Sequence, residues 1–224
     1  AALARLPQYP CYCSRKEIRA AASAPHGATP VYPGTCAAGA NPKPGKEPAI
    51  RVRVDASRIA VEDRLAGYFE QVLDREVGDF VVRRADGVYA YQLAVVVDDA
   101  RMGVNEVYRG TDLLESTPRQ IYLQRCLGFP TPDYAHAPLI VGPDGAKLNK
   151  GHRAPDLGQL REAGVDAREV VSALARSVGL LPDEASGVRL SAAELVEHYD
   201  ESRIRAHAGD RPLTLDPSWP QRPA

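Results

Sequence analysis

The chain has 224 residues, of which 44% are hydrophobic and 25% charged. This length corresponds to about one and a half domains of ~150 residues, and the composition is typical of a globular protein with a buried core. The absence of an apolar run near the ~18 residues of a membrane span, and of a secretory signal, excludes a membrane protein and favours a cytoplasmic location. We also expect a monomer.

The formal net charge of −1 conceals an uneven distribution. Residues 1–60 carry nine Lys or Arg side chains and three acidic ones, which makes this segment +6 and the remaining chain −7. A basic segment is compatible with contact to nucleic acid, and a solvated charged surface is the alternative. Only five of the 28 basic residues are lysines, and two of them, Lys147 and Lys150, lie close together.

The first quarter of the chain predicts short elements around a long loop. Residues 1–8 have the pattern of the end of a helix. The segment 14–23 predicts a short helix that begins with a capping box of Ser14 and Glu17. Residues 24–49 are rich in Pro, Gly and Ala, which is typical of a loop.

The next part alternates apolar and polar residues. Residues 50–55 predict a strand, and residues 61–77 fit either a helix or short strands. The segment 80–99 predicts two apolar strands joined by an Asp-Gly turn. Its second half contains the apolar run Leu93–Val97, which we interpret as a buried strand of an α/β sheet.

Strands and helices are then expected in succession. Residues 105–112 predict a short strand, and residues 116–128 a helix capped by Ser116 or Thr117, with Pro in its first turn and Gly after its end. Residues 136–142 predict another buried strand.

The last part of the chain predicts helices. Residues 166–179 and 191–204 are amphipathic, and each opens on Asp or Ser with Glu three residues later. The Pro-rich tail, 209–224, is expected to be extended.

The cysteines indicate a metal site. They are Cys11, Cys13, Cys36 and Cys126. In a reducing compartment, the first three thiols suit a tetrahedral structural zinc ion that needs one more ligand, and buried apolar thiols are the alternative. Nearby candidates are His26 and Tyr32, and the chemistry alone favours the imidazole of His26. Cys126 lies in a predicted helix and is interpreted as a core residue.

Four segments in order indicate a family. They are YQLAVVVDD (91–99), VYRGTDLLESTPRQIYLQ (107–124), PDYAHAPLI (132–140) and KLNKG (147–151). Together with CYC and VYPGTC, this series resembles class I aminoacyl-tRNA synthetases of the glutamyl branch. Within that branch it is most similar to the enzymes that attach glutamate to queuosine in tRNA(Asp). The resemblance covers at least residues 5–155.

The resemblance implies an α/β fold, the second half of a Rossmann-like nucleotide-binding domain with a zinc-binding insertion and a C-terminal helical subdomain. Residues 1–60 would form the insertion that contacts tRNA, and residues 61–151 the C-terminal half of the catalytic domain. Residues 152–224 would form the helical subdomain with its extended tail.

The implied reaction is ATP-dependent activation of glutamate and its transfer to the wobble queuosine of tRNA(Asp), with Mg²⁺ accompanying ATP. Negative charge builds on the phosphates in such a reaction, and lysines on a loop can offset it. KLNKG resembles the KMSKS loop, which implies catalytic roles for Lys147 and Lys150, with Lys150 contacting ATP. Asn149 departs from the usual serine, and we expect an altered rate. Without this context, a solvated loop is the alternative.

The resemblance assigns glutamate binding to Arg109 and Tyr91. A partly buried carboxylate favours a bidentate arginine, which suits Arg109. A structural ion pair with a nearby Asp is the alternative for Arg109, and strand packing is the alternative for Tyr91. The family's zinc ligands correspond to Cys11, Cys13, Tyr32 and Cys36, so the resemblance replaces His26 by Tyr32.

Both ends of the sequence bear on activity. The chain begins with Ala1, its only methionine is Met102, and it contains no HIGH-type motif, so we expect that the family's N-terminal segment is missing and that these 224 residues form no adenylate. The short segment after Gly151 favours the queuosine enzyme over a complete glutamyl-tRNA synthetase. A fragment of a discriminating glutamyl-tRNA synthetase, a non-catalytic zinc and RNA-binding module and a regulatory paralogue are the alternatives.

Overall fold

The chain forms two compact units, each built from several segments. The computed structural model describes residues 1–21, 31–39, 42–141, 157–185, 187–208 and 213–214. Unit 1 consists of Ala1–Glu62, Tyr68–Val107 and Leu113–Tyr134. Unit 2 consists of Asp63–Gly67, Tyr108–Asp112 and Ala135–Ala224. Among the described helices, none is long and apolar enough to cross a membrane.

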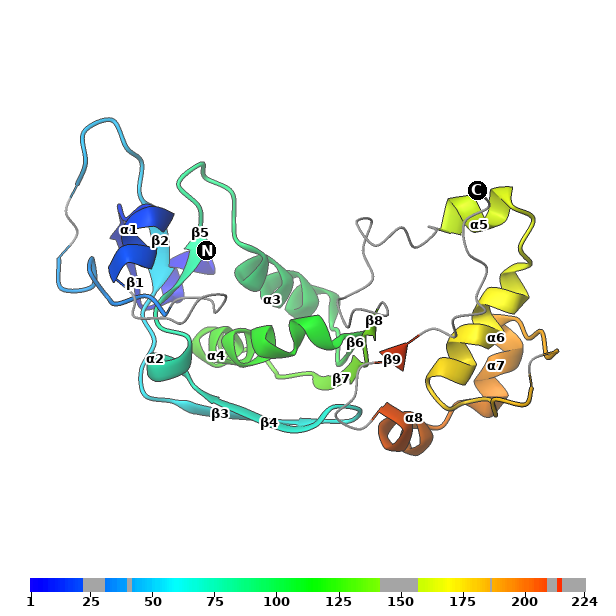
Figure 1. Ribbon diagram of the computed structural model, residues 1–224. Coiled ribbons are helices and arrows are strands. Elements are labelled where there is room, and N and C mark those ends of the chain that lie inside the picture. Colours follow the sequence, from blue (N-terminus) through cyan, green and yellow to red (C-terminus); the bar gives the residue numbers. More distant parts are fainter. Residues whose placement is uncertain (22–30, 40–41, 142–156, 186, 209–212, 215–224) are drawn as a thin grey trace. The chain divides into compact units, whose positions relative to one another are not determined.

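Short strands and helices alternate along the described chain (Figure 1). The strands are β1 (Gln8–Cys11), β2 (Ala49–Val52), β3 (Arg58–Asp63), β4 (Gly67–Val72), β5 (Phe80–Arg83), β6 (Glu106–Gly110), β7 (Asp133–Ala137), β8 (Ile140–Val141) and β9 (Leu213–Thr214). The α-helices are α1 (Arg15–Ala21), α2 (Leu73–Glu76), α3 (Tyr91–Met102), α4 (Thr117–Leu127), α5 (Leu157–Glu162), α6 (Ala167–Ser177), α7 (Ala192–Leu195) and α8 (Glu201–Ala208). The 3-10 helices are η1 (Leu3–Arg5), η2 (Thr111–Ser116) and η4 (Val196–His198).

Unit 1 contains a three-stranded antiparallel sheet of order β1-β2-β5. The strand predicted over residues 50–55 is confirmed in its first half as β2, which ends at Val52. Val52 is fully buried in the core, and Ile50 and Val54 pack against it, because alternate residues of a strand face the same side. Helices α3 and α4 pack against each other beside this sheet (Figure 1).

The apolar run Leu93–Val97 is helical, so the prediction of a buried strand is wrong. It lies in α3, where Leu93 and Val96 are the buried residues. Their spacing of three residues matches the helical repeat, and packing against α4 overrides the strand preference of the valines. The helix ends at Gly103, whose φ of +70° favours glycine. The Asp-Gly turn before this helix is present, with the Arg84 N–H donating to the Val88 carbonyl.

The helix predicted over residues 116–128 is confirmed as α4, but its predicted cap is not formed. Ser116 is at the N-cap position and makes no capping hydrogen bond. Instead, its Oγ accepts a hydrogen bond from Gln92 of α3 at 2.9 Å. Thr117 is the first helical residue and is fully buried. Cys126 packs against the core of unit 1, as predicted.

Two early predictions are also resolved. The capping box before α1 is confirmed, because Ser14 N–H donates to Glu17 Oε2 at 2.6 Å and Glu17 N–H to Ser14 Oγ at 3.2 Å. For residues 61–77, the interpretation as short strands is largely right, since β3 and β4 form a two-stranded sheet before the single turn of α2. The helical part of residues 1–8 is only the 3-10 turn η1.

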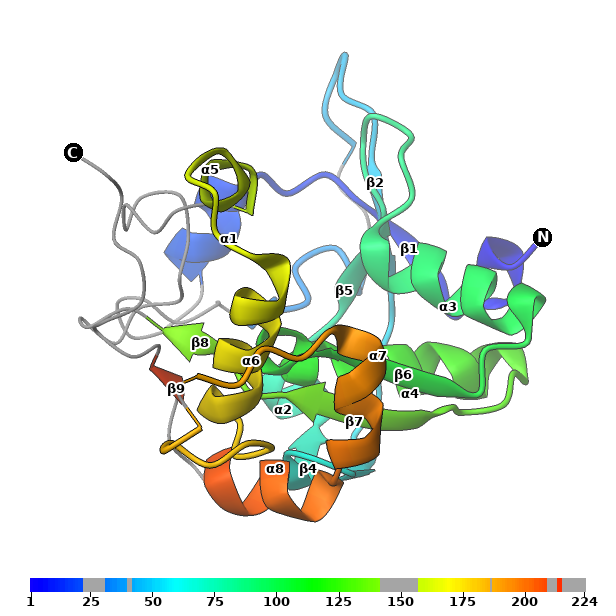
Figure 2. The ribbon, with the colours of Figure 1, turned by 90° about the vertical axis from the view of Figure 1, so that its right-hand side faces the viewer.

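Unit 2 has a smaller apolar core that involves helices α6 and α8. Its buried members are Leu65, Ala135, Ala175, Leu180, Leu181 and Ile204. The helix predicted over 166–179 is confirmed as α6, and Asp166 caps it. The helix predicted over 191–204 keeps its capping box but breaks into α7, η4 and α8, of which Figure 2 labels α7 and α8.

Of the remaining predictions, one strand is interrupted by a proline and others fall partly or wholly outside the described residues. The strand predicted over 136–142 is interrupted at Pro138, between β7 and β8. In the predicted tail, only β9 is described, and it pairs in parallel with β8. The lysines of residues 147–151 lie outside the described residues.

Candidate functional site

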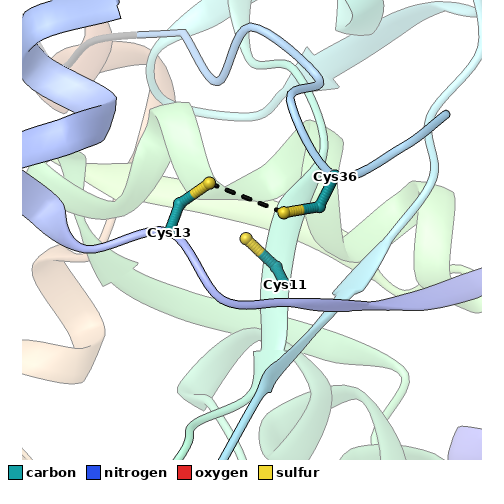
Figure 3. A group of neighbouring side chains, drawn as sticks. All are labelled: Cys11, Cys13 and Cys36. Carbon is teal, nitrogen blue, oxygen red and sulfur yellow. Dashed lines mark hydrogen bonds between the residues drawn. The ribbon is translucent and has the colours of Figure 1, made fainter. Parts of the chain in front are cut away.

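Three cysteine side chains converge in unit 1 (Figure 3). The Sγ atoms of Cys11, Cys13 and Cys36 all lie within 4.8 Å of one another. The Tyr32 hydroxyl lies 3.4 Å from the Cys11 sulfur and 3.6 Å from the Cys13 sulfur. The structure therefore brings together all four residues that the sequence predicts as metal ligands. We call this group the thiol cluster.

Tight backbone geometry holds the thiol cluster in place. Cys11 ends β1, Cys13 lies just before the capped start of α1, and Cys36 lies in a turn. Tyr32 forms an isolated parallel bridge with Gly78. A Cβ on Gly78 would lie 2.9 Å from the Tyr32 carbonyl oxygen, so this close approach of two backbones requires glycine.

Tyr32 is buried and held on several sides. The Cys36 N–H donates a hydrogen bond to its hydroxyl oxygen at 2.9 Å. The Arg51 guanidinium lies 3.8 Å from the centre of its ring and donates to the Asp79 carbonyl at 2.6 Å. Burial, followed by the hydrogen bond with Cys11, raises the pKa of Tyr32, so without a metal ion the phenol is neutral.

The donor set fits a structural zinc ion. Thiolate–zinc bonds of ~2.3 Å place neighbouring sulfurs of a tetrahedral site ~3.8 Å apart. The Cys13 and Cys36 sulfurs lie 3.6 Å apart here, and all three sulfurs lie within 4.8 Å of one another. Burial raises the pKa of Cys36, but hydrogen bonds from the Tyr12 backbone, Tyr32 and the other thiols outweigh it and lower this pKa to about 7. A thiolate, the form that binds metal, is therefore accessible at neutral pH.

Positive charge surrounds the thiol cluster. Zn²⁺ with three thiolates would carry a net charge of −1, and the buried Arg51 stacked on Tyr32 offsets charge of this sign. Lys46 donates a hydrogen bond to the Tyr12 carbonyl between Cys11 and Cys13. The alternative ligand His26 lies outside the described residues.

A second polar cluster lies in unit 2, around Arg109. This residue belongs to β6, and its Nε donates a hydrogen bond to His136 Nε2 at 2.9 Å. On the other side of the ring, His136 Nδ1 lies 2.5 Å from Asp63 Oδ2, and the side chains of Asp63 and His136 are fully buried. A predicted carboxylate-binding arginine is thus backed by an interior Asp–His pair.

The remaining predicted site residues belong to different parts of the chain. Tyr91 is the first residue of α3 in unit 1, with half of its surface exposed, whereas Arg109 belongs to unit 2. Lys147 and Lys150 lie outside the described residues. Their predicted roles, like those of Tyr91 and Arg109, stay predictions.

Sequence reasoning missed Asp63, His136 and Arg51 as parts of these clusters. His136 lies within the segment PDYAHAPLI that indicated the family, and a histidine in an otherwise apolar strand was the available signal. Asp63 gave no local signal, because its partner is 73 positions away along the chain. Arg51 looked like the exposed face of an alternating strand, but it is only 8% exposed.

Curated relatives are similar over most of the chain. The chain is 50% identical over 216 residues to the glutamyl-Q tRNA(Asp) synthetase of Symbiobacterium thermophilum, covering 91% of this chain and 66% of the relative. It is 50% identical over 190 residues to the protein of that name from Geobacter sulfurreducens, covering 81% and 60%. It is 54% identical over 180 residues to the protein of that name from Dechloromonas aromatica, covering 77% of this chain and 58% of the relative. The chain thus spans less than two thirds of the length of these relatives.

Solved structures share the fold. The glutamate-tRNA synthetase of Elizabethkingia anophelis superposes with a TM-score of 0.73 at 21% identity, over 96% of this chain and 49% of that one. The glutamate tRNA ligase of Elizabethkingia meningosepticum, crystallised with its amino acid, gives a TM-score of 0.72 at 21% identity, over 96% and 48%. The predicted α/β fold of a class I synthetase catalytic domain is therefore confirmed. Because residues 7–202 also match the family of class I tRNA synthetases (E and Q), catalytic domain, the chain belongs to that family of ligases.

Proposed function

We propose that this chain is part of a glutamyl-queuosine tRNA(Asp) synthetase, which activates glutamate with ATP and transfers it to queuosine at the wobble position of tRNA(Asp). The observation that carries the proposal is the 50% identity over 91% of the chain to a relative named for this substrate. The Arg109 cluster supports it, because an arginine held by buried partners suits recognition of a carboxylate.

The first half-reaction needs a bound carboxylate and stabilised phosphates. The glutamate carboxylate attacks the α-phosphorus of ATP and pyrophosphate leaves, so negative charge increases on the phosphate oxygens. Lys147 and Lys150 supply positive charge there in this proposal, and Mg²⁺ accompanies ATP. Arg109 binds a carboxylate of glutamate, and the Tyr91 hydroxyl is a second contact. In the second half-reaction the modified nucleoside attacks the activated carbonyl carbon of the adenylate, so that the bond between glutamate and the nucleoside forms and AMP leaves.

The thiol cluster has a structural role in this proposal. Cys11, Cys13, Cys36 and Tyr32 would hold zinc, which would tie the end of β1 to the turn that contains Cys36. The charge of +6 over residues 1–60 supports a contact of this region with tRNA. Zinc takes no part in the chemistry of glutamate transfer.

The decisive experiment compares acceptors. The full-length protein is supplied with ATP, radiolabelled glutamate and either tRNA(Asp) containing queuosine, tRNA(Asp) lacking it, or tRNA(Glu). We expect labelling only of the queuosine-containing tRNA(Asp). Labelling of tRNA(Glu) would instead identify a glutamyl-tRNA synthetase, the nearest alternative.

A second arm tests whether the protein is an enzyme at all. Arg109→Ala removes the proposed carboxylate contact and is expected to abolish glutamate-dependent ATP–pyrophosphate exchange, while Arg101→Ala, at an exposed position of α3, leaves it unchanged. Binding of tRNA without dependence on ATP or glutamate, and without exchange in the wild type, would identify a non-catalytic RNA-binding module.

A further inference from the structure

Among the described residues, Asp63 and His136 form a completely buried polar pair whose role the proposed function does not explain. Both side chains are 0% exposed. Asp63 ends β3, and His136 lies within β7. Burial of an ionised carboxylate is costly unless every lone pair is satisfied, and an apolar pair of similar size fills such a space at lower cost. Retaining the polar pair therefore calls for a reason beyond packing.

Asp63 is fully committed to fixing this ring. Its Oδ1 accepts hydrogen bonds from the backbone N–H groups of Leu65 at 3.0 Å, Ala66 at 2.8 Å and His136 at 2.9 Å. Its Oδ2 faces His136 Nδ1 at 2.5 Å. The carboxylate cannot rotate without breaking several of these bonds, so the imidazole has one fixed orientation.

The bond to Arg109 determines the tautomer of His136. An arginine Nε can only donate, because guanidinium keeps its protons at all physiological pH values. His136 Nε2 accepts this hydrogen bond at 2.9 Å and therefore carries a lone pair. The single ring proton is on Nδ1, where it is donated to Asp63. His136 is a neutral acceptor whose lone pair points at Arg109.

This geometry fixes the plane of the guanidinium. The hydrogen bond engages Nε, not a terminal nitrogen, so it restricts the rotation of the planar group about its last side-chain bonds. We propose that Asp63 and His136 are positioning residues that orient Arg109 for the glutamate carboxylate. The inference rests on the proposed function of Arg109 as the carboxylate-binding residue and adds the residues that determine its orientation.

Two substitutions of His136 separate the two hydrogen bonds. In His136→Asn, the side-chain amide nitrogen lies near the position of Nδ1, so the bond to Asp63 is retained and the acceptor for Arg109 is lost. In His136→Gln, the amide oxygen lies near the position of Nε2, so an acceptor for Arg109 is retained and the bond to Asp63 is lost. The two variants form a matched pair.

The experiment measures glutamate-dependent ATP–pyrophosphate exchange by the full-length protein. We expect His136→Asn to raise the KM for glutamate by at least about tenfold, the usual effect of losing a supporting hydrogen bond, and to leave the KM for ATP within about twofold. His136→Gln is expected to stay closer to the wild type in the KM for glutamate, although it is the less stable variant in thermal unfolding.

A purely structural role predicts the opposite order. If the pair only stabilises the fold, His136→Gln, which removes the ring N–H facing Asp63 Oδ2, is the more impaired variant in every parameter, and the KM values for glutamate and ATP change together. That result, or an unchanged KM for glutamate in His136→Asn, overturns the inference while the proposed function stands. A wild-type protein without exchange overturns the proposed function, and the inference with it.

A spectroscopic measurement tests the geometry without any turnover. Nitrogen-15 NMR of the full-length protein, with His136 assigned by comparison with His136→Gln, distinguishes protonated from unprotonated ring nitrogens. We expect a proton on Nδ1 and none on Nε2 near neutral pH. A proton on Nε2 is incompatible with the hydrogen bond from Arg109 and would refute the proposed orientation.

Discussion

Tyr32 presents a phenol to three thiols, an uncommon donor for zinc. Its oxygen accepts a hydrogen bond from the Cys36 backbone, so one lone pair is used and the oxygen is directed towards the cluster. Its ring is covered by the Arg51 guanidinium, whose positive charge favours an ionised phenol once a metal ion is bound. These neighbours make a tyrosine chemically suited to the fourth position.

Tyr32→Phe tests this ligand directly. It removes the oxygen and keeps the ring under Arg51, so we expect the fold to be retained. Loss of a residue that only supports a metal ligand lowers metal affinity by up to about 100-fold, and we expect the loss of this ligand to lower zinc affinity further. The measurement is competition with a chromogenic chelator. His26→Ala is the comparison. Loss of zinc in His26→Ala together with retention of zinc in Tyr32→Phe would identify His26 as the fourth ligand.

Asp63 links stability to pH. Burial raises the pKa of this carboxyl, but hydrogen bonds from His136 and from backbone N–H groups outweigh burial and hold it below its ordinary value. A carboxyl with a lowered pKa in the folded state stabilises the protein above the unfolded-state pKa of about 4 and loses that contribution as pH falls through the folded-state pKa.

Asp63→Asn is therefore expected to be less stable than the wild type by about 3 kcal/mol at pH 7, because a buried hydrogen-bonded charge is removed. The difference should shrink as pH falls below about 4. Urea unfolding at a series of pH values measures it, with Asp133→Asn, at an exposed position of β7, as the control. A difference that is constant with pH contradicts the assignment.

For individual residues, the sequence predicts those contacts whose partners lie close together along the chain. The C-x-C pair, Tyr32 and Cys36 fall within 26 residues and predict a cluster that the structure assembles. The pair of Asp63 with His136 depends on strands far apart in the chain, and no local pattern contains that information.

Among the elements, α3 shows where local preference misleads. Three consecutive valines favour a strand, and an Asp-Gly turn before them suggests a hairpin. The positions that pack, Leu93 and Val96, follow the helical repeat instead, and Gln92 is tied to Ser116 at the start of α4. Contacts between helices, which the sequence does not display, decide the conformation.

The two capping boxes were predictable for a physical reason. The boxes at Ser14 and Ser191 form because a side chain three residues away completes them, so the signal is entirely local. Pro138 interrupts a predicted strand for a reason that is equally local, since proline lacks the N–H that a ladder needs.

Gly78 forms the backbone bridge to Tyr32 of the thiol cluster. We expect Gly78→Ala to destabilise the protein by about 3 kcal/mol, because its φ is +67° and the added Cβ would meet Tyr32 and Val31 at 2.9 Å. Gly103→Ala is the matched control, with φ +70° and open space, and should cost about 1 kcal/mol. Thermal unfolding measures both, and equal losses would show that the backbone contact is unimportant.

Across the whole molecule, charge is segregated along the chain. Residues 1–60 carry +6 and the remainder −7, and part of the basic excess is exposed on α1 as Arg15 and Lys16. A near-neutral protein with such a basic region binds a polyanion locally and releases counterions as it does so.

The corresponding prediction concerns salt. Replacing Arg15 and Lys16 by Ala is expected to weaken tRNA binding and to reduce the slope of log affinity against log salt by about 1 per side chain. Fluorescence anisotropy over a range of NaCl concentrations measures the slope. Arg75→Ala and Arg101→Ala, both at exposed positions outside the basic segment, are the controls and should leave it unchanged.

The two faces of strand β2 contact different kinds of side chain. Val52 is sealed in the core, while the next residue on either side is an arginine, one over the Tyr32 ring and the other over the Tyr9 ring. Sliding the strand by one position would drive two guanidinium groups into hydrocarbon and leave both rings uncovered. The contacts on its two faces therefore favour a single alignment of β2 with β1. Through the contact of Arg51 with Tyr32, the thiol cluster thus helps to fix the register of the sheet beside it.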